Sequence, residues 1–234
     1  MSEDKEYLWN LYNEVIEYID GDDTHVREYV PPQVEYLKED KPSIYSTLKE
    51  LEVAVSQCTL CRLSETRHLT VLGEGPSKAK VMVIGEGPGS EEDKEGRPFV
   101  GKAGVYLDAW LKSISLDRTR NCYITNIVKC RPPHNRDPHE DEALACLAYL
   151  ERQIELVKPE GILCVGKVAA HYLLKEDKPL GQLREKIHLY QTIPVVVTYH
   201  PSAVLRNQQL RGAVWEDLQQ LAQLLHLPLV NKRG

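Results

Sequence analysis

The stretch VMVIGEGPG, residues 81–89, carries the pattern that predicts the fold. The apolar run VMVIG (81–85) does not alternate with polar residues, and a glycine-rich turn follows at once. This is typical of a strand that is buried on both faces of a parallel sheet. Three further runs are short, rich in β-branched residues and bounded by turn residues: CYITNIV (122–128), GILCVG (161–166) and IPVVVTY (193–199). We therefore expect four parallel strands.

Segments with apolar residues at helical spacing follow these runs. They cover residues 103–115, 139–157, 167–174 and 212–226. For the second of them we expect Asp137 to cap the helix, Pro138 to occupy its first turn and Glu140 to complete a capping box. Strands that alternate with helices predict an α/β fold, a three-layer α/β/α sandwich around a four-stranded parallel sheet.

The beginning of the chain differs from the rest in charge. Residues 1–50 hold 5 Lys/Arg and 13 Asp/Glu, a net charge of −8, whereas the other 184 residues hold 24 basic and 22 acidic side chains, a net charge of +2. Helices are predicted over 5–19 and 44–56, with a proline-containing linker between them. We expect residues 1–45 to form an acidic, partly helical extension and residues 46–234 to form the main domain. The extension is either a solvated arm or a segment that binds a partner.

Composition excludes a membrane-spanning class, because no run of about 18 apolar residues exists. The first residues, MSEDKEYLWN, are acidic where a secretory signal would be basic and then apolar. We therefore expect a cytoplasmic protein without membrane contacts. The formal net charge of −6 neither indicates nor excludes nucleic-acid binding, so local basic clusters must decide that question.

The spacing of the cysteines predicts a metal site. Cys58 and Cys61 are separated by two residues, so both thiolates can bind one metal or one cluster, and folding would bring Cys130 and Cys146 to them. Tetrahedral zinc and an iron–sulfur cluster both accept four thiolates. The wide separation of the second pair favours the cluster, because a zinc ribbon usually has a second close pair. The other two cysteines lie inside predicted strands and are expected to be small core residues: Cys122 and Cys164.

The glycine turn matches a dinucleotide-binding fingerprint only in part. The third glycine of that fingerprint opens a helix, whereas here the acidic run EEDKEG (91–96) follows. Pro88 lacks the backbone donor that a phosphate would use, and the glycine turn does not lead into a Lys followed by Ser or Thr, as a P-loop does. A nucleotide-phosphate site is therefore disfavoured.

The same residues suit a planar base better. The ends of parallel strands meet at one edge of a sheet, which would bring the 85–89 turn, Asn126 and His200 together. Phe99 offers a face for stacking, and the Asn126 amide distinguishes uracil from cytosine, since the wrong base leaves buried polar groups unpaired. His200 would hydrogen-bond the oxyanion of a departing base. The structural alternatives are that Asn126 caps a strand, Phe99 fills the core and His200 is not catalytic.

As a set, these motifs resemble the family 4 uracil-DNA glycosylases, the iron–sulfur branch of the uracil-DNA glycosylase superfamily. The resemblance covers about residues 50–226 and rests on the four cysteines and three motifs: GEGPGSEEDKEGRPFVGKAG (85–104), YITNIVKCRPPHNRDP (123–138) and HPSAVLR (200–206). It implies a monofunctional enzyme that flips uracil out of DNA, hydrolyses its N-glycosidic bond and leaves an abasic site. The alternative is a non-catalytic iron–sulfur DNA-binding or redox-sensing module on the same fold.

The resemblance also implies roles for individual residues. A [4Fe–4S] cluster would be held by Cys58, Cys61, Cys130 and Cys146. The uracil pocket would be built from Gly85, Gly87, Pro88, Gly89, Glu92, Phe99 and Asn126. In the best-known branch of the superfamily a water-activating Asp stands where this chain has Gly87, so another carboxylate is needed. We expect Glu86 and His200 to be catalytic, and Glu92 to be a pocket wall or a partner of the water.

DNA contacts are implied for the last motif. Val204 or Leu205 would enter the duplex as a wedge, Ser202 would contact the DNA and Arg206 would bind a phosphate. Further phosphate-binding charge is expected from Lys129, Arg131 and Arg136. We expect a monomer that acts on uracil-containing DNA in a prokaryotic cytosol or nucleoid. A repair or replication protein would be the partner of residues 1–45 if the extension binds one.

Overall fold

The computed structural model describes residues 44–230. The helix predicted over residues 5–19 lies outside this range, as do all but the last two residues of the proposed extension. The proposed boundary between residues 45 and 46 therefore stays a prediction.

A five-stranded sheet forms the centre of the fold, with the strand order β2-β1-β3-β5-β4. The four predicted parallel strands are all present: β1 (Val81–Gly85), β2 (Cys122–Asn126), β3 (Gly161–Val165) and β5 (Ile193–Thr198). The predicted total of four was wrong, because β4 (His188–Tyr190) pairs antiparallel with β5 at one edge. Three residues are too short for a recognisable apolar pattern, which is why the sequence did not indicate this strand.

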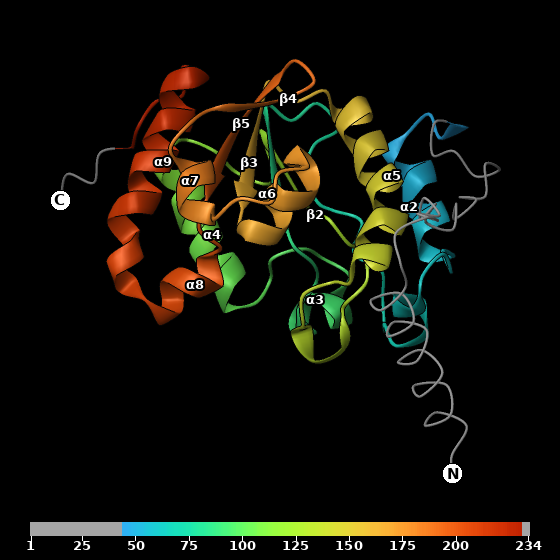
Figure 1. The fold of residues 1–234 in the computed structure, drawn as a ribbon. Coiled ribbons are helices and arrows are strands. Elements are labelled where there is room, and N and C mark those ends of the chain that lie inside the picture. Colours follow the sequence, from blue (N-terminus) through green and yellow to red (C-terminus); the bar gives the residue numbers. More distant parts are fainter. Residues whose placement is uncertain (1–43, 231–234) are drawn as a thin grey trace, which may run out of the picture. The chain divides into compact units, whose positions relative to one another are not determined.

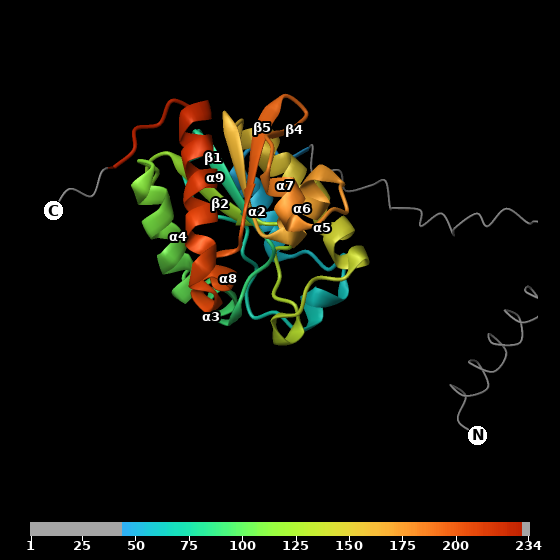
Figure 2. The ribbon, with the colours of Figure 1, turned by 60° about the vertical axis from the view of Figure 1, so that its left-hand side comes forward.

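Helices lie along both faces of the sheet, as Figures 1 and 2 show. Their bounds are α2 (Leu48–Ser56), α3 (Ser90–Glu95), α4 (Lys102–Ser113), α5 (Glu140–Val157), α6 (Lys167–Leu174), α7 (Leu180–Arg184), α8 (Pro201–Arg206) and α9 (Arg211–Leu224). Short 3₁₀ turns occur at Arg62–Glu65, Pro133–Asn135 and Gln208–Leu210. The three-layer arrangement predicted from the sequence is confirmed.

Two local predictions about helices were wrong. The cap of α5 is His139 rather than Asp137, and its backbone N–H donates to the carboxylate of Glu142 at 2.8 Å. The acidic run after the glycine turn was not expected to be helical, yet it forms α3. Its first turn holds Glu91, Glu92 and Asp93, which interact favourably with a helix N-terminus.

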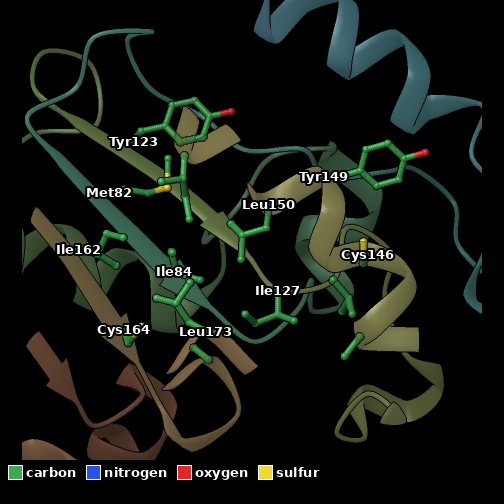
Figure 3. Close-up of a cluster of buried hydrophobic side chains, with 14 of the residues drawn as sticks. Met82, Ile84, Tyr123, Ile127, Cys146, Tyr149, Leu150, Ile162, Cys164 and Leu173 are labelled. Atoms are coloured by element: carbon green, nitrogen blue, oxygen red, sulfur yellow. The ribbon is translucent and has the colours of Figure 1, made fainter. Parts of the chain in front are cut away.

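Side chains alternate between two cores, one on each face of the sheet. Met82 and Ile84 of β1 face α2, α5 and α6, whereas Val81 and Val83 face α4 and α9. Figure 3 shows the first core, where Leu150 of α5 lies among side chains from the strands. Two cysteines fill core positions as predicted, and both are fully buried: Cys122 and Cys164. Among residues 44–230 no helix is long and apolar enough to cross a membrane.

Candidate active site

A pocket of about 500 Å³ lies beyond the carboxyl ends of the parallel strands. The turn after β1, Asn126 at the end of β2 and His200 after β5 all line it, together with Phe99. The predicted convergence of these segments is therefore confirmed. α3 and α8 lie at this end of the sheet in Figure 1.

Gly85 allows two side chains of the pocket to approach the backbone. A Cβ atom at this position would lie 2.5 Å from Oδ1 of Asn126 and 2.6 Å from Cζ of Phe99. Such distances are too short for any larger residue, so glycine is required at the last position of β1. Asn126 is the register partner of Gly85 in the neighbouring strand, which fixes the amide beside the ring.

Asn126 presents an unused hydrogen-bond acceptor. The residue is 1% exposed, and its Oδ1 atom is buried without a hydrogen-bond partner among residues 44–230. A buried acceptor that is left unsatisfied costs about 1–3 kcal/mol. Because the residue lines the pocket, a ligand with an N–H donor would satisfy this atom. The alternative in which the amide oxygen caps a strand does not fit this geometry.

Phe99 is held in a left-handed backbone conformation with φ 52°, which is rare for a residue with a large side chain. The guanidinium of Arg118 donates to the carbonyl oxygens of Pro98 and Phe99, each at 2.9 Å. Gly104 in α4 allows the backbone of Phe99 to lie close to the helix, since a Cβ at position 104 would be 1.8 Å from the Phe99 carbonyl oxygen. The ring belongs both to the second core and to the pocket wall.

His200 is oriented by the residue two positions later. The backbone N–H of Ser202 donates to Nδ1 of His200 at 3.2 Å, and the Ser202 hydroxyl lies 2.7 Å from the same atom. Burial lowers the pKa of His200 to about 4, and the positive charge of Arg206 acts in the same direction. The ring is therefore neutral at pH 7, and Nε2 carries its proton because Nδ1 is an acceptor.

The two candidate carboxylates, Glu92 and Glu86, differ in the hydrogen bonds that they accept. Oε1 of Glu92 accepts from the backbone N–H groups of Val100 and Gly101 at 2.9 and 3.0 Å, so Glu92 ties α3 to the start of α4. Burial raises the pKa of Glu86 to about 7, and the negative charge of Asp137 adds to this effect. The carboxylate of Glu86 accepts no hydrogen bond within residues 44–230 that would offset these effects.

The four predicted cysteine ligands line a second, smaller pocket: Cys58, Cys61, Cys130 and Cys146. Two of the sulfurs accept N–H donors. Nη1 of Arg67 lies 3.2 Å from Sγ of Cys130, and the backbone nitrogen of Lys129 lies 3.3 Å from Sγ of Cys146. In the described part of the chain, no group of three or more His, Cys, Asp or Glu residues is arranged to hold a single metal ion.

Comparison with known proteins agrees with this arrangement. The family model of the uracil DNA glycosylase superfamily matches residues 72–219. A type-4 uracil-DNA glycosylase of Sulfurisphaera tokodaii is 41% identical over 191 residues, which cover 78% of this chain and 86% of that protein. One from Saccharolobus solfataricus is 43% identical, with coverages of 73% and 83%. One from Thermotoga maritima is 41% identical, with coverages of 70% and 88%.

The chain belongs to the type-4 uracil-DNA glycosylases. The predicted membership is thereby confirmed, and so is the α/β fold of the superfamily.

This type-4 uracil-DNA glycosylase also has pocket residues that the sequence reasoning did not place there. Asn135, Arg136 and Asp137 line the pocket from the loop after β2. Arg136 is bound through two nitrogens to the carboxylate of Glu142, at 2.7 and 2.8 Å. These three pocket residues belong to the motif that follows β2. The sequence instead suggested that Asp137 caps a helix and that Arg136 binds a phosphate.

Two of the expected DNA contacts of this glycosylase were wrong. Val204 is fully buried in the core to which α4 and α9 also contribute, so it cannot enter a duplex. Lys129 is 1% exposed and donates to Thr125 and Asn126, so it cannot reach a phosphate. Leu205 remains as the wedge candidate because it is 41% exposed.

Of the other expected DNA contacts, Ser202 and Arg206 line the pocket. Arg131 is partly exposed, and its Nε atom donates to Oδ1 of Asn135 at 2.7 Å.

Proposed function

We propose that this protein is a monofunctional uracil-DNA glycosylase, which accepts a flipped uracil, hydrolyses its N-glycosidic bond and releases free uracil and an abasic site. The observation that carries the proposal is the buried Oδ1 atom of Asn126, which lies beside the ring of Phe99 and has no hydrogen-bond partner in residues 44–230. A planar ligand with an N–H donor at its edge satisfies that atom, and uracil has such a donor at N3. The type-4 relatives named above support the same reaction.

Base recognition follows from the two ends of the Asn126 amide. Oδ1 would accept from N3–H of uracil while Nδ2 donates to O4. Cytosine presents an acceptor at N3 and donors at position 4, so both contacts would become unfavourable. Each unsatisfied buried group costs about 1–3 kcal/mol, so the two together give strong discrimination between the bases. Phe99 would stack on the face of the base.

Departure of the base requires stabilisation of negative charge. As the C1′–N1 bond breaks, electrons move onto the uracil, mainly onto O2. The neutral His200 would donate its Nε2–H to that oxygen, since Nδ1 is held as an acceptor by Ser202. The serine thus acts as a positioning residue for the imidazole, in addition to the DNA contact expected for it.

The sugar cation that remains is captured by water. A carboxylate near C1′ would orient the water and take its proton. We assign this role to Glu86, because its carboxylate has no protein partner in the described residues and its pKa of about 7 suits a base. We assign Glu92 to the pocket wall, because its Oε1 atom is occupied by the start of α4.

Extrusion of the base from a duplex costs a few kcal/mol of stacking and pairing. Leu205, exposed on α8, would fill the space that the base leaves. Arg206, which lines the pocket, would bind a backbone phosphate near the flipped nucleotide, and Ser202 would contact the strand.

The cysteine pocket suits a [4Fe–4S] cluster. Its four ligands are all thiolates, which is the donor set of such clusters, and two of the sulfurs already accept N–H donors that stabilise negative charge. A single zinc ion also accepts four thiolates, but the wide separation of Cys130 from Cys146 along the chain favours the cluster. The cluster would tie the loop after β2 to the segment before β1, a structural role.

We further propose that the protein acts as a monomer on uracil-containing DNA in a prokaryotic cytoplasm. Residues 1–45, with their excess of acidic side chains, would limit non-specific DNA binding or dock a repair or replication protein. Deletion of residues 1–42 distinguishes these roles. Loss of a charge barrier would raise DNA affinity most at low salt, whereas loss of a docking segment would leave DNA affinity unchanged.

The proposed reaction is tested with the full chain and a labelled oligonucleotide that holds one uracil. After alkali treatment we expect cleavage at the uracil, and none in matched oligonucleotides with thymine or cytosine at that position. His200→Ala should bind the same DNA and cleave it far more slowly. Absence of cleavage by protein that retains absorbance near 400 nm would reject the enzyme and favour the non-catalytic module.

A further inference from the structure

Lys129 has a buried ammonium group that the proposed reaction does not use. Its side chain is 1% exposed, and the ammonium donates to Oγ1 of Thr125 at 2.9 Å and to the carbonyl oxygen of Asn126. No carboxylate within residues 44–230 forms an ion pair with it. Burial of a charge costs several kcal/mol unless an opposite charge and hydrogen bonds compensate, so the position of this group requires an explanation.

The groups around Lys129 that can carry negative charge are the sulfurs of Cys146 and Cys130. Lys129 lines the cysteine pocket, its backbone N–H donates to Sγ of Cys146 at 3.3 Å, and Cys130 is the next residue in the chain. Four thiolates on one cluster would keep a net negative charge next to the lysine. The cysteine site would therefore supply the compensation that no carboxylate of residues 44–230 supplies.

The other contact of the ammonium lies at the base-reading residue. β2 is an edge strand, and the N–H of Ile127 donates inward to the carbonyl of Gly85 at 2.9 Å. Because backbone groups alternate in direction along a strand, the carbonyl of Asn126 points outward, away from β1. Lys129 lies on that outer side, and its ammonium donates to this carbonyl.

A buried polar network holds the lysine in place. The hydroxyl of Thr125, which accepts from Lys129, lies 2.7 Å from the carbonyl of Leu72 and 3.2 Å from Oε1 of Gln153. The Gln153 amide donates to the same carbonyl at 2.9 Å and to the hydroxyl of Tyr123 at 3.1 Å. The ammonium is therefore fixed between β2 and α5 and cannot adjust freely.

We propose that Lys129 is a positioning residue for base recognition: its ammonium, compensated by the cysteine site, fixes the Asn126 main chain and thereby the amide that reads uracil. This inference rests on the proposed function and links the two pockets through one side chain. It predicts that loss of the ammonium weakens uracil binding while the reacting groups His200 and Glu86 stay in place.

The test compares Lys129→Met, which has a similar unbranched volume without charge or donors, with the parent and with Lys112→Met at an exposed position on α4. Inhibition by free uracil and single-turnover cleavage are measured for each protein, and iron content and the band near 400 nm are recorded. For Lys129→Met with an intact band we expect the inhibition constant of uracil and the KM to rise roughly tenfold, the effect of losing one hydrogen bond to a charged group. The cleavage rate at saturating DNA should change much less, and Lys112→Met should match the parent.

Unchanged uracil inhibition in Lys129→Met would overturn the proposal. If that variant loses its iron, Thr125→Val decides, because it keeps the lysine and the cysteines and removes one acceptor of the ammonium. Weaker uracil inhibition with an intact band then supports the proposal, and inhibition equal to that of the parent overturns it. Failure of the parent itself to release uracil would reject the proposed function instead, so the two failures are distinguishable.

Discussion

The ring of Phe99 lies 5.7 Å from the ring of His200 between centroids, with an angle of 34° between their planes. One side chain comes from the loop between α3 and α4, and the other follows β5. The proposed stacking surface and the proposed donor to the leaving group are thus neighbours on one wall. A base stacked on Phe99 would have its edge beside the imidazole.

Asn126→Ala should separate activity from stability. The substitution removes the amide that reads the base, so kcat/KM for uracil excision should fall by about 100-fold or more, from the loss of two hydrogen bonds in a buried site. Because Oδ1 has no hydrogen-bond partner in the described part of the free protein, the melting temperature should change little. A large drop in melting temperature with retained activity would contradict the assignment. Single-turnover kinetics and calorimetry measure the two effects.

Arg118→Met should impair base stacking through Phe99. Arg118 holds the carbonyls of Pro98 and Phe99, and without it the left-handed conformation of Phe99 loses its support. We expect KM to rise several-fold, with a smaller effect on the rate at saturating DNA. The matched control is Arg97→Met, since Arg97 shares the ion-pair partner Glu74 but is mostly exposed and does not bind these carbonyls. Equal effects of both substitutions would argue against a positioning role.

The pH dependence of uracil excision should reflect the ionisation of Glu86. Its pKa is raised to about 7, and a base must be ionised to accept a proton, so the single-turnover rate should rise with pH up to about 7 and then level off. The pKa of His200 is lowered to about 4, so the ring stays neutral over this range and its titration does not change the rate. Glu86→Gln should lower the plateau and flatten the profile. The same rise with pH in Glu86→Gln would show that another group titrates.

Substitution of Leu205 should affect activity on duplex DNA, whereas substitution of its neighbour Val204 should affect stability. Leu205→Ala should reduce excision from duplex DNA and affect single-stranded substrate much less, because only the duplex needs a wedge. Val204→Ala should leave both activities similar and reduce the free energy of unfolding by about 1–3 kcal/mol, through loss of buried methyl groups. Equal losses on both substrates for Leu205→Ala would exclude the wedge.

Removal of a cysteine should affect colour and folding together. Cys130→Ala should lose the absorbance near 400 nm and much of its iron, and should be less stable, because the loop after β2 would no longer be tied to the segment before β1. Cys164→Ala, at a buried position in β3 away from this pocket, should keep its iron. Spectroscopy and iron analysis suffice, and soluble, colourless and fully active Cys130→Ala protein would contradict a structural cluster.

Much of the fold could be predicted because buried parallel strands carry an unambiguous local pattern. β1 matches its predicted range, 81–85, and Asn126 and His200 follow from the rule that parallel strand ends share an edge. β4 could not be predicted, since three residues pair only because β5 offers a free edge.

The remaining errors have a tertiary cause. The six residues of α8 make fewer than two turns, so no periodicity indicated that Val204 faces the core while Leu205 faces solvent. Lys129 was expected at the surface because lysine is almost never fully buried unless it is paired. The partners of its ammonium, the Thr125 hydroxyl and the Asn126 carbonyl, come together with it only in the folded chain.

A crystal structure of the full chain with bound uracil tests the base-reading geometry. We predict that the ring stacks on Phe99 with N3 about 2.9 Å from Oδ1 of Asn126 and O2 within hydrogen-bond distance of Nε2 of His200. Uracil bound elsewhere, or in this pocket with N3 turned away from Asn126, would contradict the account.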